Sequence, residues 1–293
     1  VTDPADLDML VRFSLQEKVV LVLFGDLLRV PATGGSLLEQ RAKGARISLV
    51  YSALDAIEIA RQNREQQVVF VGTGFETTAP GTALLIMEAK SGGLKNFSVI
   101  SLHKLMPPVL RVVLTSGLCR IGGLILPGHV SAITGRLAFD FLASELGYPS
   151  VIAGFEPLDV LHATALLMEM AAGKQCAVVN GYPRVVSEQG NTVARRVVRE
   201  VFAPEAALWR GFGYIEESGL QIKPTYADFD AKKRFGLTPD FSPGGYRDEC
   251  RCSEVLRGEI TPIDCLLFGR KCTPDHPQGA CMVSAEGVCS SYL

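Results

Sequence analysis

The sequence predicts an α/β protein with parallel sheets and a separate cysteine-rich end. Short runs rich in Val, Ile and Leu recur between residues 18 and 182 of the 293-residue chain, and helix-like stretches separate several of them. Six of the eight cysteines lie in residues 250–293. These observations predict two packed α/β units followed by a third region with a different role.

Seven runs are predicted to be buried strands because they are short and rich in β-branched residues. They are residues 18–24, 45–52, 67–74, 97–102, 122–128, 149–155 and 177–182. Residues 53–66 have the apolar spacing of a helix that packs on a sheet, and so does the stretch that begins at Thr78. Alternation of strand and helix is typical of parallel sheets.

The strand positions predict two Rossmann-like parallel-sheet domains, residues 1–82 and residues 83–205. From residue 206 the sequence becomes aromatic, Gly-rich and turn-rich, as in WRGFGYIEESGL at 209–220. Residues 206–293 are therefore predicted to form a third, cysteine-rich iron–sulfur region.

Charge and hydropathy argue against several classes of partner. Lys and Arg number 29 against 31 Asp and Glu, and no long run of like charge could follow a phosphate backbone or an anionic membrane. The longest apolar stretches, such as VVLVLF at 19–24, are far shorter than the roughly 20 residues that span a bilayer. The polar start VTDPADLDML lacks the pattern of a secretory signal, so we expect a reducing, cytoplasmic location and no nucleic-acid or membrane partner.

The cysteines of the third region follow the spacing C-x1-C-x12-C-x6-C-x8-C-x7-C. No C-x2-C pair occurs, which disfavours a structural zinc site. Four thiolates on turn-rich segments can instead converge on an iron–sulfur cluster, and burial of cysteines as small apolar residues is the alternative. The preferred ligands are Cys265, Cys272, Cys281 and Cys289, with Cys250 and Cys252 in reserve. Two surplus thiols could form a redox-active pair, and His276 is expected to be a solvated loop residue.

The segment VFVGTGFETTAP, residues 69–80, predicts a strand-to-helix turn that could hold a cofactor or an anion. Gly72 and Gly74 follow the strand, and Thr77 and Thr78 stand where a helix begins. Thr77 occupies the place of the third glycine of G-x-G-x-x-G, and no G-K-[ST] occurs, so a dinucleotide site is not predicted. Glu76 is expected to be exposed at this turn. A tight turn capped by threonine is the alternative interpretation.

Two histidines follow predicted strands, at the edge where open α/β sheets bind ligands. His103 lies in SLHKLMPP and His129 in LPGHVS. We predict that both line a central cleft together with Glu76, Thr77 and Thr78. Hydrogen-bonded structural histidines are the alternative.

Many stretches together resemble the HypD family of hydrogenase maturation proteins. They are FGDLLRVP, VYSALDA, GFETTAP, SLHKLMPP, PGHVS, GFEPLDVL, QGN, WRGFG, SGL and the tail from ECRC to GVCSSYL. The resemblance implies two α/β domains and a region with a [4Fe-4S] cluster. It also implies a scaffold on which iron receives one carbon monoxide and two cyanide ligands, with a HypC-like chaperone and a HypE-like cyanide donor as partners.

The chain departs from the family pattern at its beginning. The family motifs C-G-T-H and G-P-G-C-P-V-C, whose cysteines are associated with holding the iron, do not occur, so we expect an N-terminal truncation. The resemblance therefore assigns the transient iron with its CN and CO ligands to no residue of this chain. Ser253 stands where the family typically has glycine, and Leu126 stands where the family commonly has cysteine.

The leading hypothesis is an assembly scaffold with a redox role rather than a conventional metabolic enzyme. An α/β ligand-binding module with a structural zinc or a cysteine-rich tail is the alternative. A third hypothesis is an independent reductase that acts on a small substrate without a partner protein.

Overall fold

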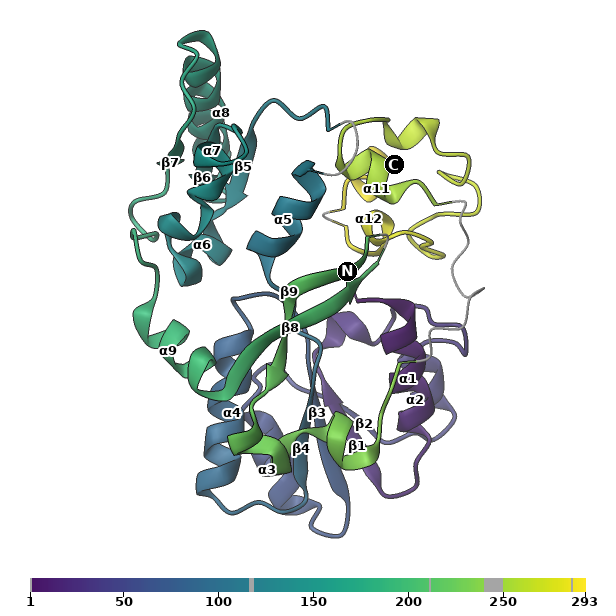
Figure 1. Ribbon diagram of the computed structural model, residues 1–293. Coiled ribbons are helices and arrows are strands. Elements are labelled where there is room, and N and C mark those ends of the chain that lie inside the picture. The colour runs from purple at the N-terminus through teal and green to yellow at the C-terminus, as the bar shows by residue number, and fades with distance from the viewer. Residues whose placement is uncertain (1, 116–118, 211, 240–249, 286) are drawn as a thin grey trace.

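The computed structural model describes residues 2–115, 119–210, 212–239, 250–285 and 287–293. It contains a four-stranded parallel sheet, a three-stranded parallel sheet and a two-stranded antiparallel hairpin (Figure 1). The strands are β1 (Val19–Leu23), β2 (Ile47–Leu49), β3 (Gln67–Gly72), β4 (Phe97–Ser101), β5 (Leu124–Pro127), β6 (Ser150–Ala153), β7 (Val178–Asn180), β8 (Phe202–Trp209) and β9 (Gly213–Ile222). All seven predicted strands are present, and the predicted α/β class is confirmed.

The helices alternate with the strands in both parallel sheets. They are α1 (Pro4–Ser14), α2 (Leu37–Ala42), α3 (Asp55–Gln62), α4 (Ala79–Ser91), α5 (Met106–Thr115), α6 (Gly128–Thr134), α7 (Phe141–Ser144), α8 (Pro157–Ala172), α9 (Thr192–Val201), α10 (Ala231–Phe235), α11 (Cys252–Leu256) and α12 (Ala280–Val283). Short 3-10 helices are η1 (Gly25–Leu27), η2 (Arg136–Phe139), η3 (Pro224–Phe229), η4 (Pro262–Asp264) and η5 (Ser290–Tyr292). Within the described ranges no helix combines the length and apolar character needed to cross a bilayer.

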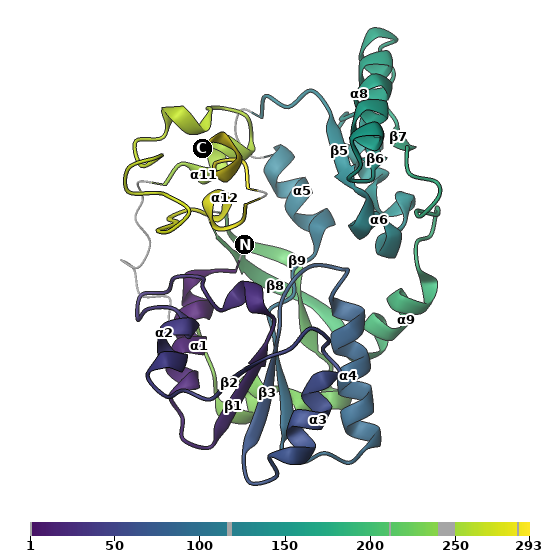
Figure 2. The same ribbon diagram turned by 180° about the vertical axis from the view of Figure 1, so that it is seen from behind.

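The first sheet has the order β2-β1-β3-β4, and helices cover both of its faces (Figures 1 and 2). Along β1 and β3 alternate residues enter two different cores, because successive strand side chains point to opposite faces. Val20 and Phe70 pack with α3 and α4, whereas Leu21 and Val71 pack with α1 and α2. The uninterrupted apolar sequence of these strands follows from this burial on both faces.

The order of the first sheet also fixes where a ligand site can form. All four strands are parallel, but the direction in which successive strands are added to the sheet reverses between β1 and β3, and open α/β sheets bind ligands at such a switch point. The predicted turn, residues 72–78, directly follows β3 at this point.

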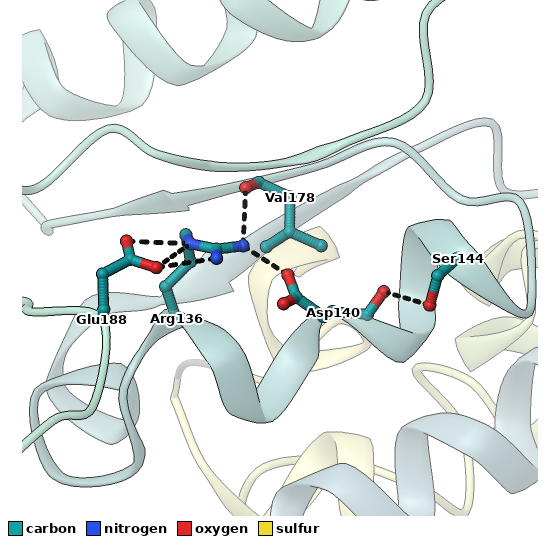
Figure 3. A network of polar contacts seen from close by, with 5 residues as sticks. All are labelled: Arg136, Asp140, Ser144, Val178 and Glu188. Carbon is teal, nitrogen blue, oxygen red and sulfur yellow. Dashed lines mark hydrogen bonds and ion pairs between the residues drawn. The ribbon is translucent and has the colours of Figure 1, made fainter.

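The second sheet, β5-β6-β7, is parallel and smaller. Leu126, Phe139 and Ile152 lie in its core. Figure 3 shows how Arg136 connects its edge: Nε donates to Glu188 Oε1 and Oε2 at 2.9 and 2.8 Å, and Nη1 contacts both Asp140 and the Val178 carbonyl. This arginine therefore joins η2 to β7 and to the loop that follows β7.

The hairpin β8–β9 returns the chain to the first sheet, a feature that the sequence analysis did not predict. Phe202 and Leu220 of the hairpin, with Tyr226 and Phe229 after it, complete the core beneath α4. Leu105 N also donates to the Ser218 carbonyl at 2.8 Å. The second α/β unit is thus an insert between β4 and β8.

The predicted division at residue 82 falls inside α4, which packs on the first sheet together with β4. Divided by sheets, the first unit continues through β4, and we place the division after Ser101. The first part of the predicted third region, through Phe235, packs on the first sheet, since Ala231 and Phe235 contact the core beside α1.

Candidate functional site

Close packing and a side-chain hydrogen bond hold the turn after β3. A Cβ at Gly72 would lie 2.5 Å from His103 Cε1, so the histidine ring occupies that space. Gly74 has φ of +111°, in the region that favours glycine. Thr78 Oγ1 donates back to the Thr73 carbonyl at 2.8 Å. Thr77, half-buried, stands beside it.

Glu76 is buried, with 8% of its surface exposed, and the expectation of an exposed carboxylate is wrong. Oε1 accepts a hydrogen bond from Met106 N at 2.8 Å, and Oε2 is buried without a hydrogen-bond partner among the described residues. Burial raises the pKa of Glu76 to about 7, against the effect of the Met106 hydrogen bond, which lowers it. The carboxyl is therefore balanced between its neutral and charged forms near neutral pH.

A cavity of about 320 Å³ brings Glu76 together with residues from both α/β units. Its walls are mainly apolar and include Pro107 after β4, Ile133 of α6 and Val198 of α9. Arg195 and Arg199 of α9 line it as well.

His103 is enclosed, with 1% of its surface exposed, and both ring nitrogens have partners. Ser101 Oγ donates to the Leu220 carbonyl at 2.6 Å and therefore accepts from Nδ1, 3.2 Å away. Nε2 then accepts from Thr82 Oγ1 at 3.2 Å. Burial lowers the pKa of His103 to about 3, so the ring is neutral at ordinary pH.

The predicted cleft residues do not form one constellation. Glu76 lines the 320 Å³ cavity, whereas His103 lines a second cavity of about 180 Å³. His129 is exposed on α6, and its ring lies 5.1 Å from that of Phe155. His103 follows β4 of the first sheet and His129 follows β5 of the second, so their positions after predicted strands do not bring them to one centre.

The second cavity contains charged residues that the sequence analysis missed as a group. Lys104, Asp6 and Glu205 line it, together with Lys232 of α10. Burial lowers the pKa of Lys104, and burial raises the pKa of Asp6 against the opposing charges of Lys232 and Lys104. In the sequence Asp6 is one of three acidic residues in the polar start VTDPADLDML, and nothing there marks it as the buried one.

The six cysteines of residues 250–293 gather in one cluster. Four of them are buried, namely Cys252, Cys272, Cys281 and Cys289, and Cys250 and Cys265 are half-buried against the same apolar core. Regular structure is sparse there, and His276 is exposed as expected. Ser253 lies in helical α11 and has no positive φ, so its backbone does not require glycine.

The thiols contact one another directly. Cys281 Sγ and Cys289 Sγ lie 3.0 Å apart. Hydrogen bonding to Cys252, with burial, raises the pKa of Cys250 far above its usual range. The Cys250 hydrogen bond lowers the pKa of Cys252, but the Cys281 contact and burial outweigh it and raise this pKa to about 11. As they stand, the described side chains include no three His, Cys, Asp or Glu groups arranged around one metal position.

The donor set nevertheless fits a soft metal cluster. Six thiols converge on one apolar region, and thiolates are the ligands that iron–sulfur clusters use. Gly279 makes room for them, since a Cβ there would lie 2.6 Å from Cys250 Sγ. Binding would require the paired sulfurs to turn away from each other, because ligands of one cluster cannot share a 3.0 Å contact.

Comparison with known proteins identifies the family of the chain. The family model HypD, described as "Hydrogenase formation hypA family", matches residues 1–293. Hydrogenase maturation factor HypD2 of Bradyrhizobium diazoefficiens is 42% identical over 297 residues, which cover 98% of this chain and 77% of the relative. Hydrogenase maturation factor HypD of Rhodobacter capsulatus is 40% identical over 291 residues, with the same coverage, and that of Escherichia coli K12 is 40% identical over 287 residues, covering 98% and 76%. The chain belongs to the HypD family of hydrogenase maturation factors.

Proposed function

We propose that this chain acts as an assembly scaffold for the Fe(CN)2CO group of [NiFe]-hydrogenase, with redox support from a [4Fe-4S] cluster. The observation that carries the proposal is the convergence of six cysteines in one buried cluster beside the two α/β units. Family membership supports the maturation role. The chemistry is assembly and electron supply rather than turnover of a soluble metabolite.

Cys265, Cys272, Cys281 and Cys289 are the proposed cluster ligands, with Cys250 and Cys252 as the alternatives. Burial favours Cys252 over Cys265, because Cys252 is buried and Cys265 is half-buried. When bound, a cluster of this kind accepts and donates single electrons at a potential set by hydrogen bonds, charge and burial. The chain supplies the thiolates, the apolar surroundings that exclude water, and the close backbone approach at Gly279.

The proposed position for the iron cargo is the edge of the first sheet. Glu76, Thr77 and Thr78 follow β3 there, and Glu76 reaches the cavity between the units. A carboxyl with a pKa near 7 can hold or release a proton beside a bound group. We propose a HypC-like chaperone and a HypE-like cyanide donor as partners in the cytoplasm, by resemblance to the family.

Anaerobic purification tests this function. Iron, acid-labile sulfide and zinc are measured per chain, together with the visible spectrum. We expect about four irons and four sulfides. Cys→Ser changes at each of the six clustered positions should separate ligands, whose loss removes the cluster, from the remaining thiols. Cys176→Ser is the matched control, because Cys176 is exposed, contacts the Ala143 carbonyl and is not part of the cysteine cluster.

The alternative is an α/β ligand-binding module, which the 320 Å³ cavity favours. This module would contain zinc without sulfide, or no metal even after anaerobic reconstitution. Either result would contradict the redox role and leave ligand binding as the function to pursue.

A further inference from the structure

Arg210 is a buried charged residue that connects the hairpin to the cysteine cluster. It follows β8 and exposes 6% of its surface. Its Nη2 donates a hydrogen bond to the Gln278 carbonyl at 2.9 Å, across 68 residues of sequence. The guanidinium thus holds the segment that precedes α12 from outside the cysteine region.

The segment that Arg210 holds lies directly against two cysteine sulfurs. Gln278 N donates to Cys272 Sγ at 3.3 Å. The next residue, Gly279, approaches Cys250 Sγ so closely that no side chain fits between them. Gln278 is therefore fixed by Arg210 at its carbonyl while its own N–H points at a thiol.

The charge of Arg210 also reaches the cluster. Arg210 Nη2 binds the carbonyl of Gln278, the residue whose own N–H donates to Cys272 Sγ. A positive charge and an N–H···S hydrogen bond both stabilise the more negative state of a metal–thiolate group.

We propose that Arg210 is a positioning residue for the cysteine cluster: it holds Gln278 so that the Gln278 N–H donates to the Cys272 sulfur. The charge of Arg210 and this N–H···S hydrogen bond together raise the reduction potential of the group that the thiols bind. The positioning of Gln278 by Arg210 does not require a bound cluster. The effect on potential rests on the proposed [4Fe-4S] function.

The first experiment uses the metal-free chain. Amide hydrogen exchange at Gln278 is compared between the wild type, Arg210→Gln, Arg210→Lys and the control Arg257→Gln. Loss of the anchoring hydrogen bond should speed exchange at Gln278 about fivefold in Arg210→Gln. Arg257 pairs with Glu259 in the same region, so its change should leave Gln278 unaffected.

Exchange in the β8–β9 hairpin serves as the internal reference. Unchanged exchange at Gln278 in a folded Arg210→Gln chain would overturn the positioning role. If Arg210→Gln does not fold, Arg210→Lys decides the question, because lysine keeps the charge but lacks the planar fork of donors.

The second experiment uses the reconstituted chain and a redox titration followed by the visible spectrum. Arg210→Gln should keep its iron and sulfide but show a more negative midpoint potential than the wild type. Arg210→Lys should lie between the two, and Arg257→Gln should match the wild type. If Arg210→Gln holds its full iron content and its midpoint potential is unchanged, the effect of Arg210 on the potential is overturned. A wild-type chain that binds no iron would contradict the proposed function. In that case the hydrogen-exchange experiment alone tests the positioning role of Arg210.

Discussion

The first α/β sheet and the cysteine region form their interiors in different ways. In the sheet, apolar strands are buried on both faces, and ionisable groups that enter, such as His103, are neutral. In residues 250–293 the interior consists largely of cysteines, with few regular elements around them. The interior of the sheet is therefore made by apolar strand residues, whereas that of the cysteine region is made largely by thiols.

The largest expected effect tests the first half of this comparison. Phe70 is fully buried in the centre of the first sheet, with its ring 5.5 Å from that of Phe24 in an edge-to-face arrangement. Phe70→Ala should lower the free energy of unfolding by about 3 to 5 kcal/mol, as measured by chemical denaturation. Tyr51→Ala, at a fully exposed position, is the control and should have little effect. Equal losses in the two variants would contradict the assignment of Phe70 to the core.

A smaller effect comes from the buried carboxyl. The folded-state pKa of Glu76, about 7, exceeds its ordinary value of 4.5, so the folded state binds the proton more tightly than the unfolded state. Its contribution to stability is therefore greatest at low pH and falls as pH rises through 4.5 to 7, by about 3 kcal/mol in all. His103 acts in the opposite direction below pH 6.5, because its pKa is lowered in the folded state.

Glu76→Gln isolates the carboxyl from the histidine. The difference in unfolding free energy between this variant and the wild type, measured from pH 4.5 to 8, should increase in favour of the variant. A difference that does not change with pH would show that Glu76 ionises normally in the folded chain.

The smallest effect concerns the turn after β3. Gly72→Ala places a methyl group against His103 and should cost about 1 to 3 kcal/mol of stability. Gly81→Ala in α4 is the matched control, because nothing lies within 4 Å of its added Cβ, and there the change should stabilise by about 0.5 to 1 kcal/mol. Thermal unfolding of the two variants should therefore shift in opposite directions, and a shared direction would contradict the close packing of His103.

The predictable parts of the molecule are those whose signal is local. Each strand of the two parallel sheets is a short run rich in Val, Ile, Leu or Phe, so all seven were predicted. The hairpin was not predicted, because Pro204 and Glu205 interrupt the apolar sequence of β8. Buried and exposed residues also do not alternate regularly along β8. Glu76 was wrongly predicted to be exposed, because its burial depends on a contact with Met106, 30 residues later in the chain.

In the cysteine region, too, the sequence predicted the local feature but not the long-range contacts. The spacing of its cysteines predicted that thiols gather, and they do. Which sulfurs touch is decided by turns and by contacts from elsewhere in the chain, such as the Arg210 hydrogen bond to Gln278. Such long-range partners leave no pattern in a single sequence.

The insertion of the second α/β unit has a consequence for biosynthesis. The core beneath α4 needs Phe202, Leu220 and Phe229, so it cannot close until the ribosome has made the hairpin and η3. The second unit, whose contacts extend to Asn191, leaves the exit tunnel before those residues. A nascent chain with residues up to about 200 outside the exit tunnel would thus hold the later unit formed and the earlier one open, and folding order would run against sequence order.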